Sequence, residues 1–190
     1  MFENDEFRKA RLAILIAFLI NGFSVGNFVS RIPDFKYELE ISNGVLGAAL
    51  FCASIGVLAA LRPTSRAAAK YGSGPVVKFS AFTLALAVPS VGLLFNLPWF
   101  LFSLFIYGVL SSIHDLSINA HAAALENRAG KRVMSTFHAM WSIGGLTGGA
   151  IGGVLASVNV SILIHAIGVG VFIVLVAFAT RNWFLPADAD

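Results

Sequence analysis

Charged residues are scarce in this chain. Asp, Glu, Lys and Arg make up only 12% of its 190 residues, whereas 57% are hydrophobic, and the mean hydropathy is +0.82. Because soluble domains carry about 25% charged residues, this composition excludes an ordinary soluble protein. Cysteine is also nearly absent: Cys52 is the single one, which excludes an internal disulfide bond.

The basic residues lack the pattern of a nucleic-acid-binding surface. The net charge of +3 and the pI near 9.3 would suit such a partner. However, Lys and Arg occur as short clusters between apolar runs, without a stripe of interleaved aromatic residues. No strand precedes the glycine-rich segment 144–153, so no phosphate-binding loop is indicated. We expect no nucleic-acid partner, no cofactor and no metal site.

Long apolar runs predict an all-α membrane protein. A helix needs about 20 apolar residues to cross the bilayer core. The run 12–30 is too long for a signal peptide and lacks a small-x-small cleavage site, so it is expected to be a retained span. We expect a polar cytoplasmic segment at 1–11, a transmembrane domain over 12–181 and a cytoplasmic tail at 182–190. The six helices are expected at about 12–30, 43–62, 76–95, 98–125, 133–156 and 160–180.

Several boundaries follow from local signals. Pro63 is expected to end the second helix, and Ser42 or Asn43 is expected to cap its start. Residues 32–36 are expected to form a short loop, and residues 72–75 a turn.

The basic residues favour one orientation. With a cytoplasmic N-terminus, eleven of the thirteen Lys and Arg residues lie on the cytoplasmic side and two lie outside. The positive-inside rule then places both termini in the cytoplasm. The two outer residues are Arg31 and Lys36.

Polar side chains interrupt two of the apolar runs. At 100° per residue, one half of the fourth helix carries Ser111, His114, Asp115, Asn119, His121 and Glu126. About a third of the first helix carries Asn21, Ser24, Asn27, Phe28 and Arg31. Polar groups at bilayer depth require a protein-lined or water-filled interior, so these faces predict a transport cavity.

We expect a substrate or proton pathway in this cavity. Its candidate residues are Asp115, Asn119, His114, Asn21, Asn27 and Ser24. A carboxyl group in a low-dielectric wall can bind and release a proton during transport. Alternatively, Asp115 could be a buried structural carboxyl bonded to His114, to Asn119 or to a neighbouring helix. Amides suit hydroxylated solutes because they both donate and accept hydrogen bonds.

A second group of residues is expected near the ends of the cavity, as a possible gate. It comprises His121, His138, Glu126, Arg31 and Trp141. His121 and His138 could meet across the fourth and fifth helices, although each could also be a simple interfacial imidazole. Trp141 is expected either to pack or to stack on a sugar, and Arg31 either to anchor the helix or to steer anions.

Small residues are expected to mediate helix packing. Gly144, Gly148 and Gly152 form one stripe of the fifth helix, Gly145, Gly149 and Gly153 form another, and Gly56 belongs to a small-residue stripe of the second helix. Two stripes allow two close neighbours.

A faint internal repeat is also present. Ser54-Ile55-Gly56 matches Ser142-Ile143-Gly144, and Gly22 lies 86 positions before Gly108. Copies separated by three helices would have opposite orientations, which predicts a 3+3 inverted repeat.

Three segments carry a resemblance to a known family. They are Arg31-Ile-Pro-Asp-Phe-Lys, Asp115-Leu-Ser-Ile-Asn-Ala-His-Ala and Met134-Ser-Thr-Phe-His-Ala. The chain resembles the major facilitator superfamily, in its fucose-permease-like bacterial branch, over about residues 8–186. The resemblance implies a multi-pass transporter of the bacterial inner membrane rather than an enzyme.

The resemblance also implies that a part is missing. Members of this family have twelve helices in two halves, and this chain matches the N-terminal half, with 185–190 resembling the start of the linker. We expect either a missing C-terminal half or a parallel homodimer whose seams are the glycine stripes of the fifth helix and the small-residue stripe of the second.

Three functional classes stay open at this stage. The first is half of a secondary transporter that moves a small polar, sugar-like solute by alternating access, with proton coupling as an option. The second is a non-transporting remnant or assembly module. The third is a membrane-embedded metalloenzyme using His114, Asp115, His121 and His138, whose spacing fits no standard zinc motif.

Overall fold

The secondary structure is entirely helical in the part of the chain that the computed structural model describes, residues 4–130 and 132–186. The helices are α1 (Asn4–Ser30), α2 (Ile32–Glu38), α3 (Asn43–Tyr71), α4 (Ser73–Gly92), α5 (Leu97–Ala129), α6 (Met134–Ser157) and α7 (Ile162–Thr180). All except α2 are long and apolar enough to cross a membrane. The predicted all-α fold with six long apolar helices is therefore confirmed.

Two segments that were expected to be non-helical belong to helices. The first span begins at Asn4 rather than near residue 12, and Lys9 pairs with Asp5 across one helical turn at 2.7 Å. Residues 1–3 lie outside the described part. Residues 32–36 are not a loop but most of α2, because Pro33 lies in the first turn of that helix, where a missing N–H is tolerated.

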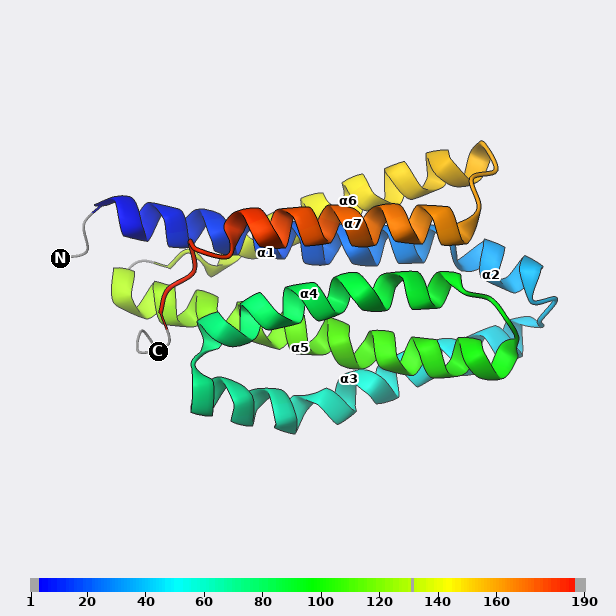
Figure 1. The fold of residues 1–190 in the computed structure, drawn as a ribbon, viewed down its shortest axis with the longest axis horizontal. Coiled ribbons are helices and arrows are strands. Elements are labelled where there is room, and N and C mark those ends of the chain that lie inside the picture. The colour runs from blue at the N-terminus through cyan, green and yellow to red at the C-terminus, as the bar shows by residue number, and fades with distance from the viewer. Residues whose placement is uncertain (1–3, 131, 187–190) are drawn as a thin grey trace.

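Helix α3 continues through Pro63, contrary to the expected end there. It begins as predicted, because the Ser42 hydroxyl caps it by accepting a hydrogen bond from the backbone N–H of Val45. Beyond Pro63, the hydroxyls of Thr64 and Ser65 donate to carbonyl oxygens one turn earlier, at 2.7 and 2.9 Å. Pro63 removes the N–H that would bond to the carbonyl of Ala59, and hydroxyl bonds of this kind within a helix favour bending. The helix bends instead of ending (Figure 1).

The connection between α3 and α4 is a single residue. Gly72 adopts φ 81° and ψ 152°, a backbone conformation available mainly to glycine. The expected four-residue turn over 72–75 is wrong, because Ser73 already begins α4 and Pro75 lies in its first turn.

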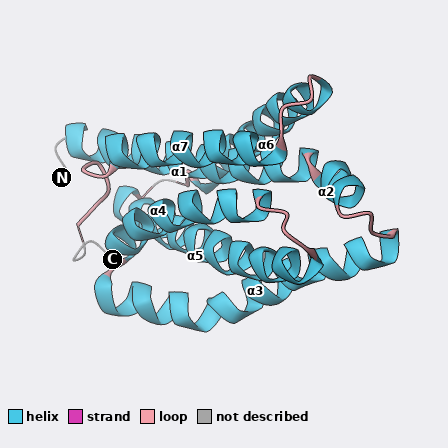
Figure 2. Ribbon diagram, turned by 45° about the vertical axis from the view of Figure 1, so that its right-hand side comes forward, coloured by secondary structure: helices cyan, strands magenta, loops and turns pink. Residues whose placement is uncertain are grey.

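The long helices lie side by side along the longest axis of the molecule (Figures 1 and 2). Helix α1 packs on α6, α3 packs on α5, and α4 lies between α5 and α7. The start of α1, the end of α7, and the α3–α4 and α5–α6 connections lie at one end of the bundle, here called the termini end (Figure 1). Helix α2 and the α4–α5 and α6–α7 connections lie at the other, here called the far end.

Two helix crossings reveal the internal repeat. A Cβ atom on Gly22 of α1 would overlap the backbone carbonyl of Trp141 in α6, and one on Gly108 of α5 would overlap the carbonyl of Ala53 in α3. The two glycines are 86 positions apart and the two carbonyl residues are 88 apart. The α1–α6 crossing is therefore repeated as the α5–α3 crossing.

The partner contacts of the same crossings repeat as well. A Cβ atom on Gly144 would overlap the carbonyl of Leu19, and one on Gly56 would overlap the carbonyl of Phe105. Gly144 lies 88 positions after Gly56, and Phe105 lies 86 positions after Leu19. Because the order of the helices in each pair is reversed, the two three-helix units are arranged as an inverted repeat.

The glycine stripes of α6 pack mainly against α1, and Gly152 also lies close to His165 of α7. Gly148 and Gly152 face α1, as Gly144 does, and Cβ atoms there would overlap Phe23 and Ser30. The second stripe also borders α1, since Cβ atoms on Gly145 and Gly149 would lie 3.8 Å from α1 carbonyl oxygens. The first stripe therefore packs within the chain, whereas Gly153 of the second stripe has nothing within 4 Å, and a seam between two chains stays a prediction.

Candidate functional site

A cluster of polar side chains surrounds Asp115 on α5. The Asn21 side chain of α1 donates a hydrogen bond to Asp115 Oδ1 at 3.0 Å. Asn21 is buried and Asp115 is half-buried. Asn119, one helical turn further along α5, donates its side-chain amide to the backbone carbonyl of Asp115 at 2.8 Å. Of the three predicted amides, Asn21 therefore contacts the carboxyl group itself, and Asn119 bonds to the backbone of the same residue.

His138 of α6 completes this arrangement. Its exposed imidazole packs edge-on against Phe18 of α1, with ring centroids 5.3 Å apart. Its ring thus packs on α1, the helix that also contributes Asn21. Asn21, Asp115, Asn119 and His138, contributed by α1, α5 and α6, are here called the Asp115 cluster. Such a set can bind a hydroxylated molecule and can hold a proton.

His114 does not share the face of Asp115. Its side chain is completely buried, and Nδ1 lies 3.0 Å from the Ser80 hydroxyl of α4. Adjacent helical residues point about 100° apart, so His114 is directed into the interior toward Ser80, while Asp115 is directed to Asn21 of α1. The expectation that His114 supports Asp115 directly is therefore wrong in this conformation.

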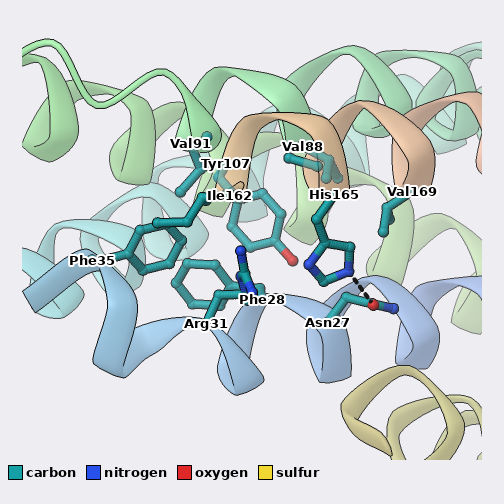
Figure 3. Close-up of a pocket in the computed structure, with 12 residues that line it drawn as sticks. Asn27, Phe28, Arg31, Phe35, Val88, Val91, Tyr107, Ile162, His165 and Val169 are labelled. Atoms are coloured by element: carbon teal, nitrogen blue, oxygen red, sulfur yellow. Dashed lines mark hydrogen bonds between the residues drawn. The ribbon is translucent and has the colours of Figure 1, made fainter. Parts of the chain in front are cut away.

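Ser24 and Asn27 belong to a different polar network. The Ser24 hydroxyl lies 3.2 Å from the hydroxyl of Tyr107, and Asn27 Oδ1 lies 2.7 Å from Nε2 of His165 on α7. The exposed fractions of Ser24 and Asn27 are only 1% and 3%. This network lies inside the bundle toward its far end, beside a cavity of about 30 Å³ (Figure 3), which is room for roughly one water molecule.

Arg31 closes this network toward the far end. Its guanidinium donates to the carbonyl oxygen of Val160, and Nε lies 3.1 Å from Oδ2 of Asp34. Only 4% of the residue is exposed. Arg31 thus ties the end of α1 to the α6–α7 connection, which fits the anchoring alternative better than anion steering.

His121 does not meet His138. The Leu185 backbone N–H donates to His121 Nε2 at 3.2 Å, and His121 Nδ1 lies 2.6 Å from the Ser73 hydroxyl. Since Nε2 accepts, we infer that Nδ1 carries the proton and donates to Ser73. With both ring nitrogens engaged by other elements, the expected pair of imidazoles across α5 and α6 is wrong. His121 instead fixes the segment after α7 against α4 and α5.

Glu126 and Trp141 serve the packing of α6. Glu126 Oε2 accepts hydrogen bonds from the backbone N–H groups of Val133 and Met134, at 2.7 and 2.8 Å. These donors begin α6 and have no partner within the helix, so Glu126 caps it from α5. Trp141 packs against the apolar cluster at the termini end, which fits the packing alternative.

Sequence reasoning missed three buried polar residues. Each lies within hydrogen-bond distance of a predicted site residue: Tyr107 of Ser24, Ser73 of His121, and Ser80 of His114. Single hydroxyls in an apolar run give no periodic signal, so their sequence context could not reveal these roles. His165 had been expected only as an anchor or capping group, and its bond to Asn27 depends on the α1–α7 contact.

Comparison with known proteins now decides the family. The family model described as Major Facilitator Superfamily matches residues 14–187, nearly the whole chain. This chain belongs to the major facilitator superfamily. The six apolar helices and the inverted repeat match that assignment, and the family indicates a membrane transporter rather than an enzyme.

Three relatives are much longer than this chain. An uncharacterized transporter of Sinorhizobium fredii is 30% identical over 83% of this chain and 43% of its own length. An uncharacterized MFS-type transporter of Yersinia pestis is 30% identical over 74% of this chain and 36% of its own. Membrane protein MosC of Rhizobium meliloti is 26% identical over 72% and 33%. The chain thus matches less than half the length of each.

The metalloenzyme alternative gains no support from the geometry. Across residues 4–130 and 132–186, no three His, Cys, Asp or Glu side chains lie close enough to hold a metal ion. Of its four suggested ligands, His114 and His121 face α4, whereas Asp115 and His138 lie on the other side of α5.

Proposed function

We propose that this chain is the N-terminal six-helix half of a secondary transporter that moves a small polar, hydroxylated solute by alternating access. The observation that carries the proposal is the Asp115 cluster: a carboxyl group, two amides and an imidazole from three apolar helices gather where lipid would not tolerate them. The family and the transporter relatives support the same class of function.

Fewer residues are proposed to contact the solute than the sequence suggested. Asn21, Asp115 and Asn119 have side chains in the cluster, whereas His114, Ser24 and Asn27 are committed to buried partners inside the bundle. Amide and carboxylate oxygens with adjacent N–H groups suit the alternating donors and acceptors of a polyol or sugar. This chemistry agrees with the fucose-permease-like resemblance and supports a sugar-like substrate.

Proton coupling is the proposed energy source. Asp115 is half-buried and is held by one neutral amide, so protonation would free that amide to bind a solute. His138 of α6, whose ring packs against Phe18 of α1, is the second titratable side chain proposed for this pathway. Asp115 is therefore proposed as the proton carrier, with His138 as its partner.

A second six-helix half is the proposed partner in the membrane. Large apolar side chains are exposed on α3 and α6, for example Phe51 and Leu58 on α3 and Leu146 and Val154 on α6. These two helices occupy equivalent positions in the inverted repeat. The relatives are more than twice as long as the matched segment, which supports a C-terminal half over a homodimer. The charge bias supports an inner-membrane location with both termini in the cytoplasm.

The transport test uses the protein reconstituted into liposomes with an imposed pH gradient. Uptake of labelled polyols and sugars is measured for the wild type, for Asp115→Asn and for the matched control Glu38→Gln, an exposed carboxyl of α2. We expect Asp115→Asn to abolish the pH dependence and the control to retain it. Unchanged pH dependence in Asp115→Asn would contradict the coupling role.

An assembly module without transport activity is the second candidate, favoured by the fact that the chain covers less than half of its relatives. Cysteine crosslinking from Leu58→Cys on α3 and Leu146→Cys on α6 separates the two. A crosslinked second half or second copy together with measurable uptake supports the transporter, whereas a crosslinked partner without uptake of any solute supports the module.

A further inference from the structure

A groove at the termini end of the bundle lies outside the Asp115 cluster. It has a volume of about 440 Å³ and is lined by α3, α4 and one residue of α5. The lining residues are Pro63, Thr64, Ala67, Tyr71, Pro75, Val76, Phe79 and Ile113. Its walls are almost entirely apolar, and Tyr71 and Phe79 are 55% and 67% exposed.

Two prolines give the groove its shape. Pro63 bends α3, so that the last two turns of this helix diverge from α5 (Figures 1 and 2). Pro75 lies in the first turn of α4 and forms part of the opposite wall. Ala67 lies between Pro63 and Tyr71 on the same face of α3 and keeps the groove open, because it carries only a methyl group.

The mouth of the groove is positively charged. Arg62, Arg66 and Lys70 are spaced one turn apart along α3, directly beside the lining residues of that helix. The Lys70 ammonium lies 4.9 Å from the centre of the Tyr71 ring, which lines the groove. Lys78 on α4 adds a fourth cation in the sequence next to Phe79.

Within residues 4–130 and 132–186, no carboxylate pairs with these four cations. The sequence contains neither Asp nor Glu from residue 41 to residue 114. None of the four forms an ion pair with any described residue of the chain. An apolar slot at bilayer depth with unpaired cations at its mouth is complementary to a molecule that is apolar along its length and anionic at its end.

We propose that this groove binds an anionic phospholipid, with an acyl chain between α3 and α4 and the phosphate headgroup beside Arg66 and Lys70. Basic pockets between transmembrane helices on the cytoplasmic side are suited to such headgroups, and each cation contributes about fivefold in affinity. The long apolar lining excludes a free phosphate ion as the main ligand, because inorganic phosphate would leave that lining in water.

The headgroup is tested by native mass spectrometry of the detergent-extracted protein. The protein is offered equal amounts of phosphatidylglycerol and phosphatidylcholine with identical acyl chains. We expect a preference for phosphatidylglycerol that falls by about 25-fold in the double variant Arg66→Gln/Lys70→Gln. The control Arg132→Gln removes an exposed charge that does not line the groove and is expected to keep the preference.

The acyl-chain slot is tested with a second pair of variants. Ala67→Trp fills the groove, whereas Ala69→Trp places the same side chain about 200° around α3, on an exposed position. We expect Ala67→Trp to lose the first bound lipid and Ala69→Trp to keep it. Phe79→Ser, which removes apolar wall without adding bulk, should also weaken binding.

Three results would overturn the proposal. One is an unchanged lipid preference in Arg66→Gln/Lys70→Gln. Another is full lipid binding in both Ala67→Trp and Phe79→Ser while both retain the wild-type unfolding temperature. The third is displacement of the lipid by inorganic phosphate or glycerol phosphate at equal concentration, which would show a free-anion site instead.

Discussion

Replacing Gly144 with Ala should destabilise the chain, whereas replacing its neighbour Gly145 should not. A Cβ atom at Gly144 would come closer than 3.0 Å to the backbone carbonyl of Leu19 in α1. Backbone cannot rotate away as a flexible side chain can, so α1 and α6 would have to separate. At Gly145 the nearest atom would be 3.8 Å away, an ordinary van der Waals contact.

The magnitude follows from two opposing effects. Overpacking of a close helix contact costs about 1–3 kcal/mol of unfolding free energy. Replacing glycine with alanine inside a helix gains about 1 kcal/mol when the new methyl group meets no obstacle. The two variants should therefore differ by about 2–4 kcal/mol, with Gly144→Ala the less stable.

The assay is reversible unfolding in mixed detergent micelles with increasing SDS, followed by helical circular dichroism. Gly56→Ala, at the repeat-related α3–α5 crossing, should resemble Gly144→Ala because its Cβ atom would overlap the Phe105 carbonyl. Gly153→Ala meets nothing within 4 Å and serves as a second control. If Gly144→Ala and Gly145→Ala unfold at the same SDS fraction, the close α1–α6 crossing is not what stabilises the bundle.

Three further predictions concern polar side chains. Glu126→Ala should lower the SDS fraction at which the protein unfolds, because two backbone N–H groups at the start of α6 lose a charged acceptor. Asn27→Leu and His165→Phe should each cost about 1–3 kcal/mol, and the double variant should cost less than their sum, because each single change leaves a buried partner unsatisfied. His121→Phe should speed hydrogen exchange at the Leu185 amide, measured by mass spectrometry, because that N–H loses its acceptor.

Each of these has a distinct contrary result. Glu126→Ala with wild-type stability would mean that water caps α6 equally well. Strictly additive losses for Asn27 and His165 would mean that the two side chains do not bond to each other. Unchanged exchange at Leu185 would mean that the segment after α7 is protected by its apolar contacts alone.

Hydrophobic length determined the fold class without help from tertiary structure. Six apolar runs of about 20 residues leave few solutions other than helices, because backbone polar groups in lipid must be satisfied within each segment. The small-residue pattern around Gly56 and Gly144 also survived in the structure, as crossings that only a missing side chain permits. The proximity of Asp115 to Asn119 followed from helical periodicity alone.

Tertiary structure decided which polar residues share a site. His114, Asp115 and His121 lie on one half of a helix by periodicity, yet α4 takes both imidazoles and α1 takes the carboxyl group. A helical wheel assigns all three residues to one half of α5. It cannot show that different neighbouring helices bind different side chains of that half. The local rule also failed at Pro63, which predicts a helix end, whereas α3 bends there and continues to Tyr71.

The sequence by itself therefore determined that this protein is a helical membrane protein with polar groups at depth, since lipid imposes that pattern on any chain that crosses it. Only the tertiary structure decided that Asn21 meets Asp115 while Asn27 meets His165. The physical reason is that hydrogen bonds between side chains 94 and 138 positions apart depend on how the helices cross, and those crossings are set by backbone contacts at a few glycines.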